Sequence, residues 1–110
     1  ASGILGNNDE LIKKLVKCGD ENGERLWEMP MYPEYFDTLK SDVADMKNSG
    51  GRGGGTTVAA LFLQNFVDSE TPWAHIDIAG TSVIENAVLE NPKGATGVGV
   101  RTILNYILGD

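Results

Sequence analysis

The sequence predicts an α/β fold in which helices and strands alternate along the chain. The clearest helical signal covers residues 100–108, where apolar side chains recur at the i, i+3, i+4, i+7, i+8 spacing of one helix face. The best strand covers residues 73–78, where apolar side chains alternate with His75 and Asp77. We therefore expect one or two strands of this chain to complete a sheet that is begun elsewhere, with helices on the sheet faces.

The first helix is expected shortly after the N-terminus. Asn7, Asn8 and Asp9 can cap it, and the apolar side chains that follow fall on one stripe with lysines opposite. The stripe comprises Leu11, Ile12, Leu15 and Val16. This spacing predicts about four turns. The helix is expected to end near Gly19 or, better, near Gly23.

The middle of the chain is expected to hold a short strand and two further helices. Residues 26–29 are typical of a strand closed by Pro30, and Pro33 suits the first turn of a helix over residues 34–39. After a glycine-rich loop at residues 50–55, the segment 58–67 is apolar except for two polar positions. A helix that is apolar almost all round is a buried helix and needs partners on several sides. Helices are thus expected to outnumber strands.

Length and charge limit the classes of function. A chain of 110 residues is expected to be a single domain or a fragment of one, over residues 1–110. At this size folding buries roughly 65% of the surface of the unfolded chain. Sixteen acidic residues against nine basic ones give a net charge of −7, which repels phosphate backbones. Nucleic acid is therefore not an expected partner.

The sequence also predicts a cytoplasmic protein with no membrane partner. The longest strictly apolar run, residues 58–63, is far shorter than the ~20 residues of a membrane span. The start of the chain lacks a basic region followed by a long apolar stretch, so no signal peptide is expected. Cys18 is the single cysteine, which excludes an internal disulfide and fits a reducing compartment.

The glycine loop is the first candidate ligand site. Glycines at residues 50–55 followed by Thr56 and Thr57 have the composition of a phosphate loop at a helix start, where backbone amides can hold an anion. The lysine of that motif is missing, and no apolar strand precedes the loop. We therefore favour a flexible turn that lets the helix pack closely, with Arg52 solvated or paired to a carboxylate.

The titratable side chains give no convincing catalytic set. His75 and Asp77 face the same side of one strand, and a structural hydrogen bond between them is favoured over a metal site. Asp42 and Asp45 are expected to be solvated rather than paired for acid and base work. An acidic cluster is also expected to be solvated helix surface: Asp20, Glu21 and Glu24. The residues alone therefore predict no catalytic side chain.

Several short sequence motifs occur in an order that is more informative than any one motif alone. The two most telling are Trp73-Ala74-His75-Ile76-Asp77-Ile78-Ala79-Gly80-Thr81 and Ala95-Thr96-Gly97-Val98-Gly99-Val100-Arg101. The others are residues 1–7, 23–30, 41–45, the glycine loop with residues 57, 59 and 60, residues 62–63 and 66–67, and the single positions Tyr35 and Asn48. In this order and at about this spacing they resemble the C-terminal part of the catalytic domain of the leucyl aminopeptidase family.

The resemblance implies a mixed central sheet flanked by helices, in an enzyme that removes the N-terminal residue of peptides. In that family two divalent metal ions, commonly zinc, manganese or magnesium, activate a bridging water, and the complete enzymes are hexamers. The family's metal-binding and catalytic phrase, roughly Asn-Thr-Asp-Ala-Glu-Gly-Arg, does not occur in these 110 residues. The resemblance therefore implies that the chain has no catalytic or metal-binding residue of its own and that those residues precede Ala1.

The resemblance also places three residues of this chain on the wall of the substrate pocket. Ala79 and Ser82 belong to the turn that lines the pocket for the substrate's N-terminal side chain, and Ser49 borders the leaving-residue side. Ser82 stands where some relatives carry methionine and Ser49 where some carry isoleucine, so a roomier or more polar pocket is expected. The alternatives are a small residue required by tight packing at Ala79 and an ordinary loop serine at Ser82.

The sequence thus predicts the C-terminal fragment of a metal-dependent leucyl aminopeptidase that is inactive as an isolated chain. Its expected partners are a peptide substrate, the upstream part of the same polypeptide and further copies in a homo-oligomer. The competing hypothesis is a non-catalytic assembly or oligomerisation module that associates through the apolar helix at residues 58–67. An anion-binding protein that uses the glycine loop is a third hypothesis.

Overall fold

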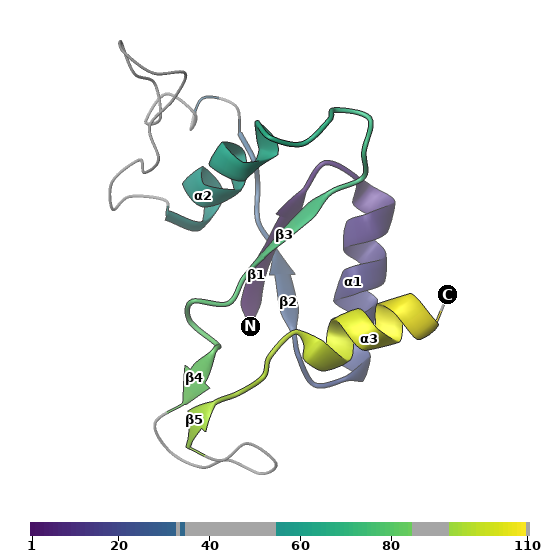
Figure 1. Cartoon of the computed structure of the whole chain (residues 1–110), viewed down its shortest axis with the longest axis vertical. Helices are drawn as coiled ribbons and strands as arrows, with labels where there is room; N and C mark the ends of the chain where they lie inside the picture. The colour runs from purple at the N-terminus through teal and green to yellow at the C-terminus, as the bar shows by residue number, and fades with distance from the viewer. Residues whose placement is uncertain (33, 35–54, 85–92, 110) are drawn as a thin grey trace.

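A three-stranded mixed sheet lies at the centre of the computed structural model, which describes residues 1–32, 34, 55–84 and 93–109 (Figure 1). The strand order is β2 (Leu26–Glu28), β1 (Ser2–Gly6) and β3 (Ala74–Asp77). β1 runs parallel to β2 and antiparallel to β3. The predicted α/β class is therefore confirmed, with a mixed sheet as the resemblance implied.

The central strand β1 was not expected from the sequence pattern. Ile4 and Leu5 are both 0% exposed, so this strand is buried on both faces. A Cβ atom at Gly6 would lie 2.4 Å from the carbonyl oxygen of Trp73, and only glycine allows β3 to start this close to β1. With β1 included, the described residues form five strands and three helices, so within this part of the chain helices do not outnumber strands as expected.

Helix α1 (Asp9–Glu21) covers one face of the sheet and follows the predicted pattern. Asn8 is its N-cap, and the Asn8 side chain accepts a hydrogen bond of 2.9 Å from the backbone N–H of Leu11. The buried side chains of the helix pack with two strand residues in one apolar cluster: Ile4, Ile12, Leu15 and Leu26. The helix ends at Glu21, between the two glycines considered as its stop.

Helix α2 (Gly55–Gln64) covers the opposite face. A Cβ atom at Gly3 would meet Thr56 of α2, whereas the neighbouring Ile4 packs on α1, and successive strand residues point to opposite faces. The described residues bury Thr57, Val58, Ala60 and Leu61 of α2 and leave Leu63 40% exposed. This apolar helix was expected to need partners on several sides, and the described residues cover only part of it.

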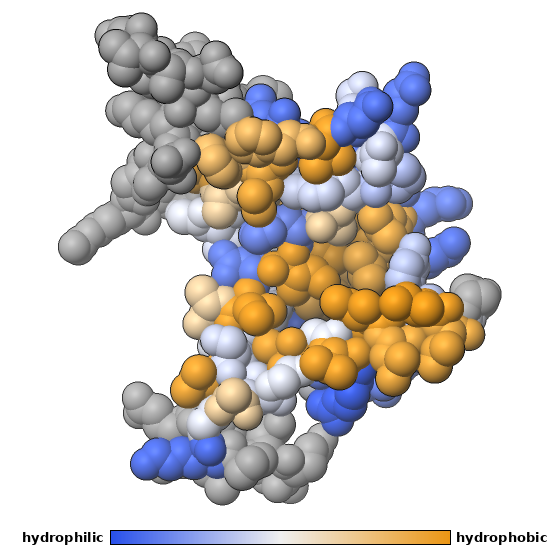
Figure 2. Space-filling view, in the orientation of Figure 1, coloured by the Kyte–Doolittle hydropathy of each residue, from blue (hydrophilic) through white to orange (hydrophobic). Residues whose placement is uncertain are grey.

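Helix α3 (Val100–Leu108) begins after a two-stranded ribbon, β4 (Val83–Ile84) and β5 (Gly94–Ala95), and lies beside α1 (Figure 1). Its helical period was predicted correctly, but its apolar stripe is not buried. Thr102 is the buried residue of this helix, and an exposed apolar ridge faces outward (Figure 2). The ridge consists of Val100, Ile103, Leu104, Ile107 and Leu108. It is called the α3 ridge below.

Several sequence expectations lie outside the described residues. These are the helix after Pro33, the glycine loop up to residue 54, and the side chains of Asp42, Asp45, Ser49 and Arg52. Within the described part of the chain, no helix is long and apolar enough to cross a bilayer.

Candidate functional site

The turn that follows β3 is the described part of the predicted substrate wall. The carbonyl oxygen of Ile78 accepts hydrogen bonds from the backbone N–H groups of Thr81 at 3.1 Å and Ser82 at 2.9 Å. These bonds reverse the chain and leave Ala79 exposed and Ser82 half-buried. We call residues 78–82 the wall turn.

Asp77 fixes the entry to the wall turn. Its carboxylate accepts a hydrogen bond of 2.9 Å from the backbone N–H of Ala79 and another from the Thr56 hydroxyl. These two bonds, with a smaller contribution from the charge of His75, hold the pKa of Asp77 below its ordinary value. The carboxylate thus bonds to the turn and to α2, and the expected hydrogen bond between His75 and Asp77 was wrong.

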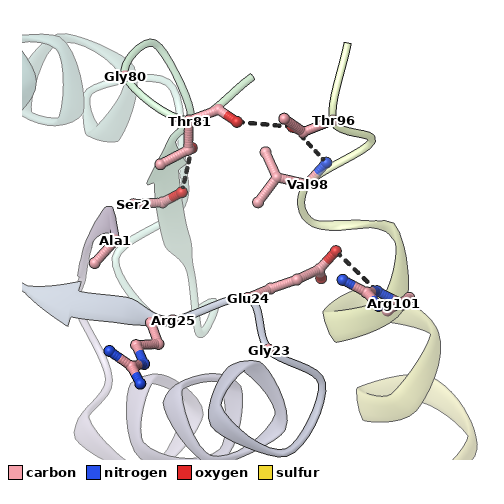
Figure 3. Close-up of a pocket in the computed structure, with 10 residues that line it drawn as sticks. All are labelled: Ala1, Ser2, Gly23, Glu24, Arg25, Gly80, Thr81, Thr96, Val98 and Arg101. Atoms are coloured by element: carbon pink, nitrogen blue, oxygen red, sulfur yellow. Dashed lines mark hydrogen bonds and ion pairs between the residues drawn. The ribbon is translucent and has the colours of Figure 1, made fainter. Parts of the chain in front are cut away.

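Thr96 holds the other side of the wall turn (Figure 3). Its backbone N–H donates to the Ser82 carbonyl at 2.9 Å, and its hydroxyl donates to the Thr81 carbonyl at 2.7 Å. The same hydroxyl accepts from the backbone N–H of Val98 at 3.2 Å. Thr81 in turn shares a 2.6 Å hydroxyl contact with Ser2 at the start of β1. Thr96 and Ser2, which lie far apart in the sequence, therefore both hold this turn.

Glu24 anchors the start of α3. One carboxylate oxygen accepts from the backbone N–H of Thr102 at 2.8 Å and from its hydroxyl at 2.7 Å, and the other accepts from Arg101 Nε at 3.4 Å. Gly99, the N-cap residue, has no side chain for this purpose, so Glu24 supplies the missing acceptor. Burial raises the pKa of Glu24, but the hydrogen bonds from Thr102 and Arg101 outweigh it and leave that pKa lowered.

The burial of Glu24 corrects the expectation that it faces solvent. Its relative exposure is 5%, because the loop after α1 carries it under the first turn of α3. The backbone makes the same close approach, since a Cβ atom at Gly19 would lie 2.4 Å from the carbonyl oxygen of Glu24. Asp20 and Glu21 are exposed, as expected for the rest of that acidic cluster.

A cavity of about 460 Å³ lies between the wall turn, the start of β1 and the start of α3 (Figure 3). Its lining combines hydroxyl, carboxylate and guanidinium groups with small residues: Ala1, Ser2, Gly23, Glu24, Arg25, Gly80, Thr81, Thr96, Val98 and Arg101. Ala79 and Ser82 are not part of this lining. The cavity therefore borders the wall turn at Gly80 and Thr81.

The described residues offer no metal centre. No group of three or more histidine, cysteine, aspartate or glutamate side chains within them can hold a metal ion. Cys18 is a free, half-buried thiol on α1. A metal-dependent reaction would thus need ligands from elsewhere.

Comparison with known proteins decides the family. The family model described as "Cytosol aminopeptidase family, catalytic domain" matches residues 1–104. The chain belongs to this family. A probable cytosol aminopeptidase of Geobacter sp. (strain M21) is 56% identical over 107 residues, which are 97% of this chain and 22% of the relative.

Solved structures of cytosol aminopeptidase relatives have the same fold. A mutant of tomato leucine aminopeptidase matches with a TM-score of 0.89 and 39% identity, over 99% of this chain and 21% of that one. The bottromycin maturation enzyme BotP in complex with Mn matches with a TM-score of 0.90 and 34% identity, over 96% of this chain and 24% of BotP. The predicted resemblance is confirmed, and the chain spans about a fifth of the length of the curated relatives that it matches.

The sequence reasoning missed Thr96 and Glu24 as structural residues of this site. Thr96 lay within a quoted phrase, but nothing in its spacing connects it with Thr81, which is 15 residues away. Glu24 bonds to a residue 78 positions away, a separation at which no local pattern operates. A signal was nevertheless present, because Gly99 at the start of a predicted helix leaves that helix without a side-chain cap.

Proposed function

We propose that this chain is the C-terminal part of the catalytic domain of a metal-dependent aminopeptidase, which removes N-terminal residues from peptides. The observation that carries the proposal is the match to the family's catalytic domain over residues 1–104. Relatives named as cytosol aminopeptidases are four to five times longer than the matched segment, so the activity belongs to a longer polypeptide. The chain supplies one portion of that domain.

The proposed enzyme uses two divalent metal ions, zinc, manganese or magnesium, held by residues outside this chain. The described residues do not fit a metal, because they contain no ligand cluster. The match to BotP, whose structure was solved in complex with Mn, supports metal dependence and leaves the native ion open. No step of the reaction is therefore assigned to a metal on this chain.

The proposed contribution of this chain is the wall of the substrate pocket. Ala79 and Ser82 would line the site for the substrate's N-terminal side chain, and Ser49 would border the leaving residue. The exposed position of Ala79 on a turn fixed at both ends supports this role, because an exposed rigid turn can present a small side chain to a ligand. Small residues at all three positions favour a roomy pocket that also accepts polar groups.

The proposed partners are a peptide, the remaining part of the same polypeptide and further copies of the enzyme in a hexamer, in the cytoplasm. The α3 ridge supports a protein partner, since five large apolar side chains on one helix face are exposed in the described structure. The same ridge is the observation that favours the second candidate, a non-catalytic assembly module.

A full-length chimaera tests the proposal. The 107 matching residues of the Geobacter sp. (strain M21) relative are replaced by this chain, and hydrolysis of a leucyl anilide is measured with manganese, zinc or magnesium. Metal-dependent turnover close to that of the unmodified relative is expected. A chimaera that fails to fold, or that folds and assembles without turnover, would contradict the enzyme proposal, and the folded, inactive form would favour the assembly module.

A further inference from the structure

We propose that Thr96 is a positioning residue that sets the location of the wall turn and thereby the preference for the substrate's N-terminal side chain. This inference rests on the proposed function. Thr96 acts through Thr81 and Ser82, whose carbonyl groups it binds.

The Thr96 hydroxyl makes a bond that the backbone pairing of the β4–β5 ribbon does not require. Val83 pairs with Ala95 and Ile84 with Gly94, so a bond between the Thr96 N–H and the Ser82 carbonyl continues the same antiparallel ribbon. The 2.7 Å bond from the hydroxyl to the Thr81 carbonyl is additional. It extends the bonding between the two segments by one residue, from Ser82 to Thr81, beyond the end of the ribbon.

The Thr96 hydroxyl has a defined partner both as a donor and as an acceptor. It donates to Thr81 and accepts from the backbone N–H of Val98, which fixes the orientation of the side chain. Valine has nearly the same shape and can do neither. It would leave a carbonyl and an N–H group without these partners in a half-buried place, whereas serine would keep both bonds.

Thr96 is itself held in place by the segment that leads to α3. The segment to α3 passes through Gly97 and Gly99 at positive φ, 67° and 98°, and ends at the Thr102 backbone that Glu24 binds. The contact of Thr81 with Ser2 ties the opposite side of the turn to the central strand. The wall turn is thus fixed between the sheet and the start of α3, and Thr96 is the link to α3.

The test uses the full-length chimaera with Thr96→Val, Thr96→Ser and the control Thr71→Val. Thr71 lies on an exposed turn, and its hydroxyl makes no hydrogen bond within the described residues, so this control makes the same atomic change without breaking a bond. Values of kcat and KM are measured for leucyl and alanyl anilides. Hydrogen exchange at the Thr81 and Ser82 amides is followed on the same proteins.

We expect Thr96→Val to change the leucyl to alanyl ratio of kcat/KM about three- to tenfold, mainly through KM, because the bond from the hydroxyl to the Thr81 carbonyl of the wall turn is lost. Thr96→Ser and Thr71→Val should keep the parental ratio. The Thr81 and Ser82 amides should exchange faster in Thr96→Val alone.

Two results would overturn the inference and spare the proposed function. One is an active Thr96→Val chimaera with the parental ratio. The other is an equal loss of kcat on both substrates, which indicates general destabilisation. A folded parental chimaera without turnover would instead overturn the proposed function, and unchanged exchange in Thr96→Val would then also reject the positioning role.

Discussion

Two carboxylates show how single residues stabilise this structure. Asp77 binds the turn that follows its own strand, and Glu24 binds a helix start that lies 78 residues further along the chain. The sequence indicated that Asp77 is structural but named the wrong partner, and it placed Glu24 in solvent. Both errors have the same origin. Asp77 binds a backbone N–H group and Glu24 binds a distant helix start, and no residue type in the sequence marks either partner.

Glu24 predicts a stability difference that depends on pH. Its pKa is lower in the folded protein than the ordinary value of 4.5, so its stabilising effect is complete above that value. The effect is lost as the pH falls through the lower folded pKa. Glu24→Gln should therefore destabilise the chimaera by about 2 kcal/mol near neutral pH, and the deficit should shrink in acid.

Urea unfolding between pH 7 and pH 3 measures this deficit. Glu70→Gln serves as the control, since the Glu70 side chain is exposed. A deficit that is independent of pH would show that the carboxylate charge is not what binds the start of α3.

Periodic sequence patterns predicted the helices and strands whose formation depends on local apolar spacing and capping. Helices α1 and α3 and strands β2 and β3 were expected from apolar spacing and from Asn8 as a cap, and all four are present. Strand β1 was missed because its apolar run is only Ile4 and Leu5 between glycines, too short for a period to show. Its central place follows from pairing with two other strands, which a single-sequence pattern does not contain.

Close strand packing predicts that replacement of Gly6 destabilises the fold. Gly6→Ala places a Cβ atom 2.4 Å from the Trp73 carbonyl oxygen, so β1 and β3 must separate, at an expected cost of about 1–3 kcal/mol. Gly80→Ala is the matched control, because a Cβ atom there meets no atom within 4 Å. The midpoint of urea unfolding should fall for the first variant and not for the second. Equal midpoints would contradict the observed spacing of the two strands.

The α3 ridge predicts how the isolated chain behaves. An exposed helix face of five large apolar side chains should drive self-association of the 110-residue chain. Leu104→Gln with Ile107→Gln should reduce association in sedimentation, with little cost in helix content because both side chains are about half or more exposed. The control is Lys13→Gln, on the exposed side of α1. A chain that sediments as a monomer before any substitution would contradict this use of the ridge.

At the scale of the whole molecule, the chain matches only part of the length of its relatives. It matches the family's catalytic domain over residues 1–104, yet it covers about a fifth of its curated relatives and has no metal-ligand cluster among its described residues. The order of short phrases predicted this membership, whereas composition and periodicity alone led no further than an α/β class. The pocket residues Ala79, Ser82 and Ser49 remain predictions, and Ser49 lies outside the described residues.

The most direct measurement is leucyl anilide hydrolysis by the 110-residue chain and by the full-length chimaera, each before and after manganese is added. We expect no metal-dependent turnover by the chain, and turnover by the chimaera that is lost on chelation and restored by metal. Metal-dependent turnover by the chain alone would overturn the proposal that the metal ligands lie outside it, because this chain would then hold a metal centre of its own.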